Sequence, residues 1–385
     1  MTRKILFLTG TRADFGKLKT LIKHVEESNG LEAAIFITGM HTLSRYGYTL
    51  DEVYKALPEH RLRDGTRSVY VYHNQVVGEP MERILATTVE GLSRYVSEFT
   101  PDLIVVHGDR IEALAGAIVG ALRNILVAHI EGGEVSGTVD ELIRHAVTKM
   151  SHIHFVANAE ASRRLIQLGE LPENIHIIGS PDIDLMMSPS LPDIAEVKRY
   201  YDIPFIDYGV IIFHPVTTDL KDTERSAKAI ISAVLQSKRE HVVIFPNNDE
   251  GCELIFNAWS ELEGNHRVKL IPSMRVEYFL VLLRNARYLL GNSSAGIREC
   301  PVFGVPAINI STRQTGRATA SCIMNVKGEV EQIMSAMNIC WNNLERFAPD
   351  LSFGAGNSAQ LFVDALVDER LWDVSTQKLF KDFNG

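Results

Sequence analysis

The chain has 385 residues, of which 45% are hydrophobic and 23% are charged, and these values are ordinary for a globular protein of about two domains. The net charge of −9 and the pI near 5.8 argue against a nucleic-acid-binding protein, because such proteins present strongly basic faces. A small anionic ligand remains compatible with this charge, because a few local arginines can hold one.

Features that report on cell compartment are consistent with one another. Four cysteines, at positions 252, 300, 322 and 340, show no CxxC spacing and are expected to be reduced, buried thiols. The segment 1–12 is charged and then briefly apolar, which is too short for a signal peptide or a membrane span. We therefore expect a cytoplasmic protein that binds neither a membrane nor nucleic acid.

Strands and helices alternate along the first half of the chain. Short apolar runs predict strands at 4–9, 33–38, 68–72, 103–106, 125–130, 153–157 and 175–178. Amphipathic runs such as 18–27 and 83–99 have helical spacing and lie between them. This alternation predicts a parallel, doubly wound sheet.

The pattern breaks at 188–207, where three prolines predict a linker with one short helix. A second alternation follows, with strands expected at 209–213, 241–245, 268–271, 287–290 and 305–310. We therefore predict an α/β protein with a Rossmann-like domain over 1–187, a linker over 188–207 and a second Rossmann-like domain over 208–370. The segment 371–385 is expected to form a terminal helix that packs back on the first domain.

Two such domains are expected to enclose a central cleft, and clefts between domains are preferred ligand sites. In open α/β sheets, ligands bind beyond the carboxyl ends of the strands. Polar motifs at those ends are therefore the first candidates for function.

The motif GTRADFGK, residues 10–17, follows the first strand and opens the first helix. A turn at a helix N-terminus exposes N–H groups that attract anions, and Arg12 and Lys17 add positive charge. The motif is not GxGxxG, so the dinucleotide fingerprint is absent. The alternative interpretation is a simple helix cap with Asp14 as the N-cap residue.

A similar turn, GNSSAGIRE at 291–299, follows the strand at 287–290. Its small residues allow a pyrophosphate to approach the backbone, and Glu299 could accept hydrogen bonds from ribose hydroxyls. Alternatively, Ser293 or Ser294 caps a helix.

Three further motifs and one histidine pair are also candidates for function. HPVTT at 214–218 and FPNNDEG at 245–251 supply polar groups at strand ends, and STRQ at 311–314 offers Arg313 to a phosphate. His152 and His154 form an HxH pair, but without nearby cysteines we predict no metal site.

Carboxylates gather just after the strands at 103–106 and 125–130 and in the segment that follows the second of these strands. They are Asp109, Glu131, Glu134, Asp140 and Glu141. Each alone could be a solvated loop acid or a helix cap, and Asp140 fits the latter. Their clustering at strand ends favours a catalytic set.

The motifs HGDR, HIEGGEVSGTVDELIRH, FHPVTTD and GNSSAGIRE together resemble the hydrolysing UDP-N-acetylglucosamine 2-epimerases of sialic acid biosynthesis, nearly from end to end. The resemblance implies a GT-B type fold, a homodimer or homotetramer, and no cofactor or metal. It also implies conversion of UDP-GlcNAc and water to UDP and N-acetylmannosamine, by anti elimination of UDP to 2-acetamidoglucal and then syn addition of water.

By the same resemblance, Asp109, Glu131 and Asp140 are catalytic acids, without an assignment of acid and base, and His214 lies at the diphosphate or the leaving-group oxygen. The residues implied to bind the UDP-sugar are Arg12, Asn247, Asn248, Ser293, Ser294, Glu299 and Arg313, to which Lys17 is added for its charge. The chain has Ser311 where the family usually has glycine before TRQ, which loosens the placement of Arg313.

Four alternatives remain open at this point. The first is a hydrolysing 2-epimerase that acts on UDP-2,4-diacetamido-2,4,6-trideoxyglucose in legionaminic acid synthesis. The second is a GT-B glycosyltransferase, which would need an acceptor site. The others are a non-hydrolysing 2-epimerase and a non-catalytic nucleotide-sugar sensor.

Overall fold

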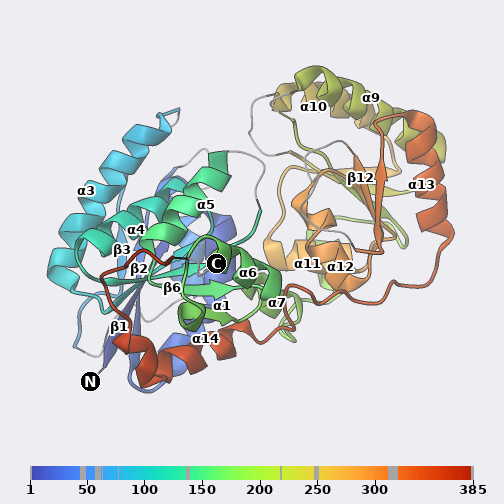
Figure 1. Ribbon diagram of the computed structural model, residues 1–385. Helices are drawn as coiled ribbons and strands as arrows, with labels where there is room; N and C mark the ends of the chain where they lie inside the picture. The colour runs from blue at the N-terminus through green and yellow to red at the C-terminus, as the bar shows by residue number, and fades with distance from the viewer. Residues whose placement is uncertain are drawn as a thin grey trace. The chain divides into compact units, whose positions relative to one another are not determined.

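A computed structural model describes residues 2–43, 49–56, 62, 64–76, 78–135, 139–216, 219–246, 251–310 and 320–382. The chain divides into two compact units: unit 1 contains Met1–Met187 and Ser352–Gly385, and unit 2 contains Ser188–Leu351. Each unit has its own parallel sheet covered by helices (Figure 1). The predicted α/β class with two parallel sheets is therefore confirmed.

Unit 1 is built on a seven-stranded sheet with the order β3-β2-β1-β4-β5-β6-β7. Its strands are β1 (Arg3–Thr9), β2 (Leu31–Ile37), β3 (Val69–Val71), β4 (Leu103–His107), β5 (Leu126–Ile130), β6 (Ile153–Val156) and β7 (Ile175–Ile177). Its helices are α1 (Arg12–Glu27), η1 (Gly39–Thr42), α2 (Leu50–Ala56), α3 (Met81–Phe99), α4 (Ile111–Leu122), α5 (Val139–Met150), α6 (Ala159–Gln167), η3 (Pro172–Asn174), α7 (Pro181–Met186), α14 (Ser358–Val367) and η6 (Glu369–Asp373).

Alternate side chains of β1 enter two separate cores, one on each face of the sheet. Ile5 and Phe7 pack with α1 and α14, whereas Leu6 and Leu8 pack with α3, α4 and α5. Strands buried on both faces are continuously apolar, which is why they were visible in the sequence. All twelve predicted strands are present, with boundaries within two residues of the predicted ones.

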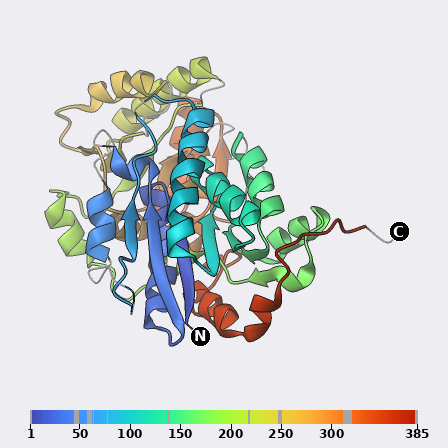
Figure 2. The same ribbon diagram turned by 90° about the vertical axis from the view of Figure 1, so that its left-hand side faces the viewer.

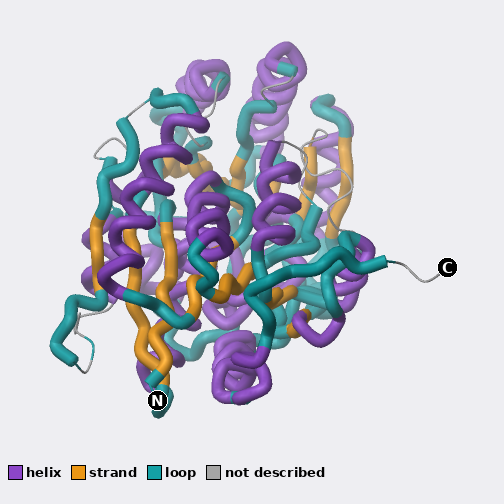
Figure 3. The backbone as a smooth tube through the Cα atoms, turned by 60° about the vertical axis from the view of Figure 1, so that its left-hand side comes forward, coloured by secondary structure: helices purple, strands orange, loops and turns teal. Residues whose placement is uncertain are grey.

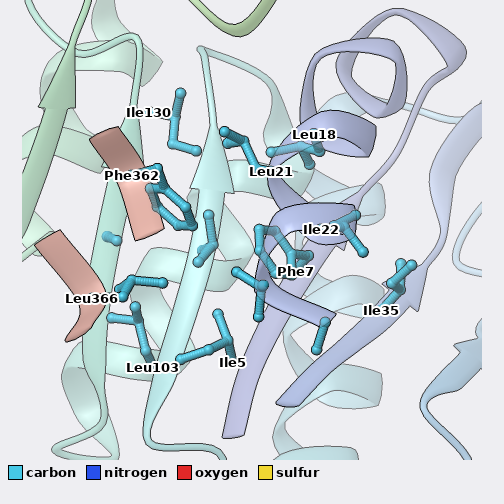
Figure 4. Close-up of a cluster of buried hydrophobic side chains, with 14 of the residues drawn as sticks. Ile5, Phe7, Leu18, Leu21, Ile22, Ile35, Leu103, Ile130, Phe362 and Leu366 are labelled. Carbon is cyan, nitrogen blue, oxygen red and sulfur yellow. The ribbon is translucent and has the colours of Figure 1, made fainter. Parts of the chain in front are cut away.

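Helix α14 belongs to unit 1, so the prediction that the second domain runs to residue 370 is wrong. Its apolar face is buried on the first sheet, where the ring centroids of Phe362 and Phe155 are 4.7 Å apart. In Figure 4, Phe362 and Leu366 point from α14 toward the strands of this sheet. Asp184 accepts hydrogen bonds from the backbone N–H groups of residues 358 and 359 at 2.9 and 2.7 Å, which satisfies the start of the helix.

The predicted terminal helix over 371–385 is also wrong in its described part, residues 371–382. The 3-10 helix η6 ends at Asp373, and the chain then continues as extended loop (Figure 3). Figure 2 shows this segment leaving the end of α14 and running across unit 1. Its anchor is Lys378, which donates to Ser151 O at 2.7 Å and to the carboxylate of Glu170. Hydrogen bonds to unit 1, and not the formation of a helix, hold this segment in place.

Unit 2 has a six-stranded parallel sheet with the order β10-β9-β8-β11-β12-β13. Its strands are β8 (Gly209–Ile212), β9 (His241–Ile244), β10 (Val268–Ile271), β11 (Leu289–Gly291), β12 (Ala307–Ile310) and β13 (Ile323–Val326). Its helices are α8 (Ile194–Tyr200), α9 (Leu220–Ser237), α10 (Cys252–Trp259), η4 (Ser260–Leu262), α11 (Val276–Arg284), η5 (Ser294–Gly296), α12 (Glu299–Phe303) and α13 (Val330–Asn342).

Two features of unit 2 differ from the expectation. The segment 188–207 is not a free linker, because Val197 of α8, Ile203 and Phe205 are buried in the core of unit 2. Strand β13 was not predicted, since its residues are only partly buried and one of them is the polar Asn325. Among the described residues, no helix combines the length and the apolar character that crossing a membrane requires.

The anchor at Glu170 makes a prediction for stability. Glu170 is 3% exposed and also accepts from Lys149 at 2.7 Å and from His154 at 2.9 Å. Burial raises its pKa, but hydrogen bonds from His154, Lys149 and Lys378 outweigh burial and lower the pKa to about 2. Lys378→Met should therefore lower the free energy of unfolding at neutral pH by about 1–3 kcal/mol, because a buried carboxylate loses a donor.

Urea unfolding of both proteins measures this difference. The stabilisation from Glu170 is complete above the ordinary pKa of 4.5 and is lost as the pH falls toward about 2, so the difference should shrink in acid. The control is Lys228→Met, which removes an exposed i,i+4 pair with Glu224 and should leave the stability nearly unchanged. Equal stability of the Lys378 and Lys228 variants would contradict the role of Lys378 as an anchor of the C-terminal segment.

Candidate functional site

The predicted acids of unit 1 gather at the carboxyl ends of β4 and β5, which pair in parallel. Asp109 follows β4, Glu131 follows β5, and Asp140 lies in the first turn of α5. The turns after adjacent parallel strands lie at the same edge of a sheet, which is where ligands bind in such folds. This edge, defined by Asp109, Glu131 and Asp140, is called the acid edge below.

Glu131 is held in an uncommon backbone conformation. Its φ angle is +64°, in the left-handed region that costs a residue other than glycine about 1–3 kcal/mol. Its backbone N–H donates to Phe155 O at 3.1 Å, which ties the residue to β6. Strain of this kind persists only where neighbouring structure enforces it, and it is concentrated at functional sites.

The carboxylate of Glu131 is only 4% exposed and is surrounded by donors. Lys17 donates to its two oxygens at 2.7 and 3.0 Å, and Ser180 donates to Oε1 at 2.8 Å. His107 Nε2 lies 3.2 Å from Oε2. The ammonium group of Lys17 thus forms an ion pair with an acid of the protein. Its contact with the UDP-sugar remains a prediction.

Arg144 connects two of the three acids. It is 6% exposed, and its guanidinium donates to the carboxylate of Asp109 and to the backbone oxygen of Glu131. Asp140 precedes it by four residues on α5, so both side chains leave the same face of the helix. Sequence reasoning assigned no role to Arg144, although its i,i+4 relation to Asp140 in DELIRH was a usable signal.

His129 holds the turn that follows β4. Its Nε2 bonds to Gly108 O at 2.8 Å and its Nδ1 to Thr148 Oγ1 at 3.1 Å. Burial holds its pKa well below the ordinary value, so the ring is neutral at physiological pH. A neutral ring with one donor and one acceptor suits these two oxygen partners.

The glycine turn after β1 is closed by a capping box. Thr11, and not Asp14, is the N-cap residue of α1. The Asp14 carboxylate accepts from the backbone N–H groups of Gly10 and Thr11, each at 3.0 Å. These N–H groups are therefore already used inside the protein. Arg12 Nε forms an ion pair with Glu52 at 3.0 Å.

In unit 2, the two predicted motifs at strand ends are joined by one buried amide. The side chain of Asn292 accepts from the backbone N–H of His214 at 2.7 Å and donates to His214 O at 2.8 Å. The strands that precede them, β8 and β11, are neighbours in the sheet. Sequence reasoning missed Asn292, which is the second residue of the GNSS turn.

The serines of this turn have different roles. Ser293 caps the short helix η5 by accepting from the N–H of Ala295 at 3.3 Å, as the alternative interpretation held. Ser294 is exposed, and Glu299 begins α12. The predicted residues Asn247, Asn248 and Arg313 lie outside the described residues.

The remaining candidates have structural partners. His154 bonds to Glu170, and His152 Nδ1 accepts from the N–H of Val127 at 3.0 Å. Within the described ranges, no group of three or more histidine, cysteine or acidic side chains is arranged to hold a metal. All four cysteines are free thiols and buried.

Known proteins share this architecture. The family model described as UDP-N-acetylglucosamine 2-epimerase matches residues 23–367. The chain is 44% identical to a UDP-N-acetylglucosamine 2-epimerase of Neisseria meningitidis serogroup B, over 99% of this chain and 100% of that protein. It is 33% identical to a UDP-N,N'-diacetylbacillosamine 2-epimerase (hydrolyzing) of Legionella pneumophila, over 89% of this chain and 90% of that protein.

A solved UDP-GlcNAc 2-epimerase from Neisseria meningitidis has the same fold, with a TM-score of 0.77 at 18% identity, and covers 94% of this chain and 99% of its own length. The two parallel sheets therefore define a GT-B-like fold. The chain belongs to the UDP-N-acetylglucosamine 2-epimerase family.

Gly291 at the end of β11 makes the second prediction. Its φ is +140°, and a Cβ there would lie 1.9 Å from the backbone oxygen of Ile212. Gly291→Ala should therefore displace the turn that carries Asn292 and lower stability by about 1–3 kcal/mol or more. Gly296→Ala is the matched control, because its Cβ would meet Ala307 at an ordinary 3.5 Å. Thermal unfolding compares the two, and equal losses would refute the explanation.

Proposed function

We propose that this chain is a hydrolysing UDP-GlcNAc 2-epimerase, which converts UDP-GlcNAc and water to UDP and N-acetylmannosamine in sialic acid biosynthesis. The observation that carries the proposal is the acid edge, where Arg144 joins Asp109, the backbone of Glu131 and the helix of Asp140. Membership in the epimerase family supports the substrate class.

The chemistry explains why several acids are needed. The C-2 proton of the sugar is not acidic until cleavage of the bond between C-1 and oxygen builds oxocarbenium character. A carboxylate near the ring then stabilises the cation, and another removes the proton. The 2-acetamidoglucal that results from this anti elimination must receive a proton at C-2 and water at C-1. Acids on both faces of the ring therefore suit the proposed reaction.

The surroundings of Glu131 and Asp109 suit these roles. A cationic partner fixes the position of a carboxylate. Groups fixed in this way stabilise a developing charge better than mobile groups do. Lys17 and Arg144 are such partners.

The nucleotide is proposed to bind mainly through unit 2. The residues assigned to it are His214, Ser293, Ser294, Glu299, Asn247, Asn248 and Arg313, with Arg12 from unit 1. The bond between Asn292 and His214 supports a joint role of the HPVTT and GNSS turns, because it fixes one turn against the other.

Incubation with UDP-GlcNAc in heavy water tests the reaction. The expected products are UDP and free N-acetylmannosamine that carries deuterium at C-2, detected by NMR and mass spectrometry. Retention of the original hydrogen at C-2 would reject the elimination. Accumulation of UDP-N-acetylmannosamine would indicate a non-hydrolysing epimerase, and a requirement for an acceptor sugar would indicate a glycosyltransferase.

The second candidate substrate is UDP-2,4-diacetamido-2,4,6-trideoxyglucose. The relative of Legionella pneumophila, which is named a hydrolyzing 2-epimerase of UDP-N,N'-diacetylbacillosamine, supports it. The 44% identical relative, which is named for UDP-N-acetylglucosamine, favours the first substrate. A comparison of kcat/KM for the two sugars decides between them.

Substitution of the acids is the third prediction. Asp109→Asn, Glu131→Gln and Asp140→Asn should each lower kcat by about a hundredfold or more, because each removes a proton acceptor or donor. Affinity for UDP, measured by calorimetry, should change far less. The control is Glu224→Gln on α9, an exposed acid that pairs with Lys228 at 2.6 Å, and it should leave kcat unchanged. Rates near wild type in all three variants would remove the acid edge from the reaction.

A further inference from the structure

A buried carboxyl group that the proposed reaction does not use lies beneath the glycine turn of unit 1. Glu112 is in the first turn of α4 and is 3% exposed. A Cβ added to Gly10 would lie 2.6 Å from its Cδ, and one added to Gly39 would lie 2.6 Å from its Oε1. The side chain thus packs against the two glycines that follow β1 and β2, where the absence of a Cβ leaves room for it.

This carboxyl group has few polar contacts. Its Oε2 makes no hydrogen bond within the described part of the chain, and the Nε of Arg110 lies 3.5 Å from this oxygen. Burial raises the pKa of Glu112, and the charge of Asp14 adds to this, whereas Arg110 and the backbone N–H of Glu112 oppose it. Burial therefore favours the uncharged form of this carboxyl group.

The other titratable groups at this point belong to the two turns. Asp14 is engaged by the N–H groups of Gly10 and Thr11. His41 Nε2 is 3.0 Å from Thr9 Oγ1 and 4.0 Å from Asp14, and burial lowers the pKa of this histidine. Its ring is therefore already neutral in the alkaline range. Arg12, at the end of the turn, is paired with Glu52.

We propose that Glu112 is a positioning residue, whose buried side chain packs against both Gly10 and Gly39 and thereby sets the turn that carries Arg12. The inference rests on the proposed function, in which Arg12 binds the UDP-sugar. Glu112 does not touch the reacting atoms. Its loss therefore weakens substrate binding and affects the chemical step less.

A charge at this position has a separate consequence. If Glu112 ionises, a buried negative charge appears beneath the turn that receives a negatively charged ligand, and the two repel each other. The KM of the wild-type enzyme then rises in alkaline buffer. Glutamine has nearly the same shape and does not titrate, so Glu112→Gln removes this rise.

The experiment measures kcat and KM for UDP-GlcNAc across about pH 6 to 9 in the wild type and in Glu112→Gln, Glu112→Ala and Glu112→Asp. Glu112→Gln should keep a KM near wild type and lose the alkaline rise. Glu112→Ala should raise KM about tenfold with a smaller change in kcat, because binding is lost in the ground state as well as in the transition state. Glu112→Asp should retain the alkaline rise with a higher KM throughout.

Two controls separate the possible failures. Glu90→Gln, on the exposed face of α3, should change nothing. Calorimetric titration with UDP over the same pH range measures the affinity for the nucleotide without catalysis. It therefore tests Glu112 even if UDP-GlcNAc is not the substrate. An inactive wild type would refute the proposed function, whereas the calorimetric series would still decide the role of Glu112.

The inference is overturned if Glu112→Gln is impaired as strongly as Glu112→Ala, because the charge or the proton of Glu112 is then required. It is also overturned if Glu112→Ala binds UDP and UDP-GlcNAc as the wild type does. Thermal unfolding shows whether each variant folds. If Glu112→Ala does not fold, the pH profiles of the glutamine and aspartate variants decide by themselves.

Discussion

Negative side chains can share one sheet edge only if cations and donors compensate their charge, and this constraint organises unit 1. Outside water, the repulsion between carboxylates and the cost of burying each of them are both large. Lys17 from α1 and Arg144 from α5 supply the compensation, and Ser180 adds a neutral donor. The ends of β4 and β5 are thereby fixed to α1, which lies far from them in the sequence, and to α5, which follows β5.

The same principle operates on backbone groups at the strand ends of unit 2. A turn that follows a buried strand has N–H and C=O groups that need partners, and an unpaired group would destabilise the fold. The amide of Asn292 supplies one donor and one acceptor to the backbone of His214. Two turns that could move independently become one element, which is what a site for an extended ligand such as a nucleotide requires.

The return of the chain to unit 1 completes the architecture. Asp184 receives the start of α14, Phe362 fills the core beside Phe155, and Lys378 meets the buried Glu170. Each contact joins residues that are more than 170 positions apart in the chain. Unit 1 therefore becomes complete only after unit 2 has been synthesised, and its sheet is stabilised by both ends of the sequence.

Local runs of apolar and polar residues were enough to predict the two parallel sheets, the positions of the twelve strands and the presence of acids at strand ends. The assignment of α14 to unit 1 and of 188–207 to unit 2 could come only from the packing of the folded chain. This packing also decided that Lys17 faces Glu131, that Arg144 faces Asp109, and that Thr11 caps α1. The reason is physical: periodicity shows that a face will be buried and that a charge needs a partner, but the surface and the partner depend on contacts between distant parts of the chain.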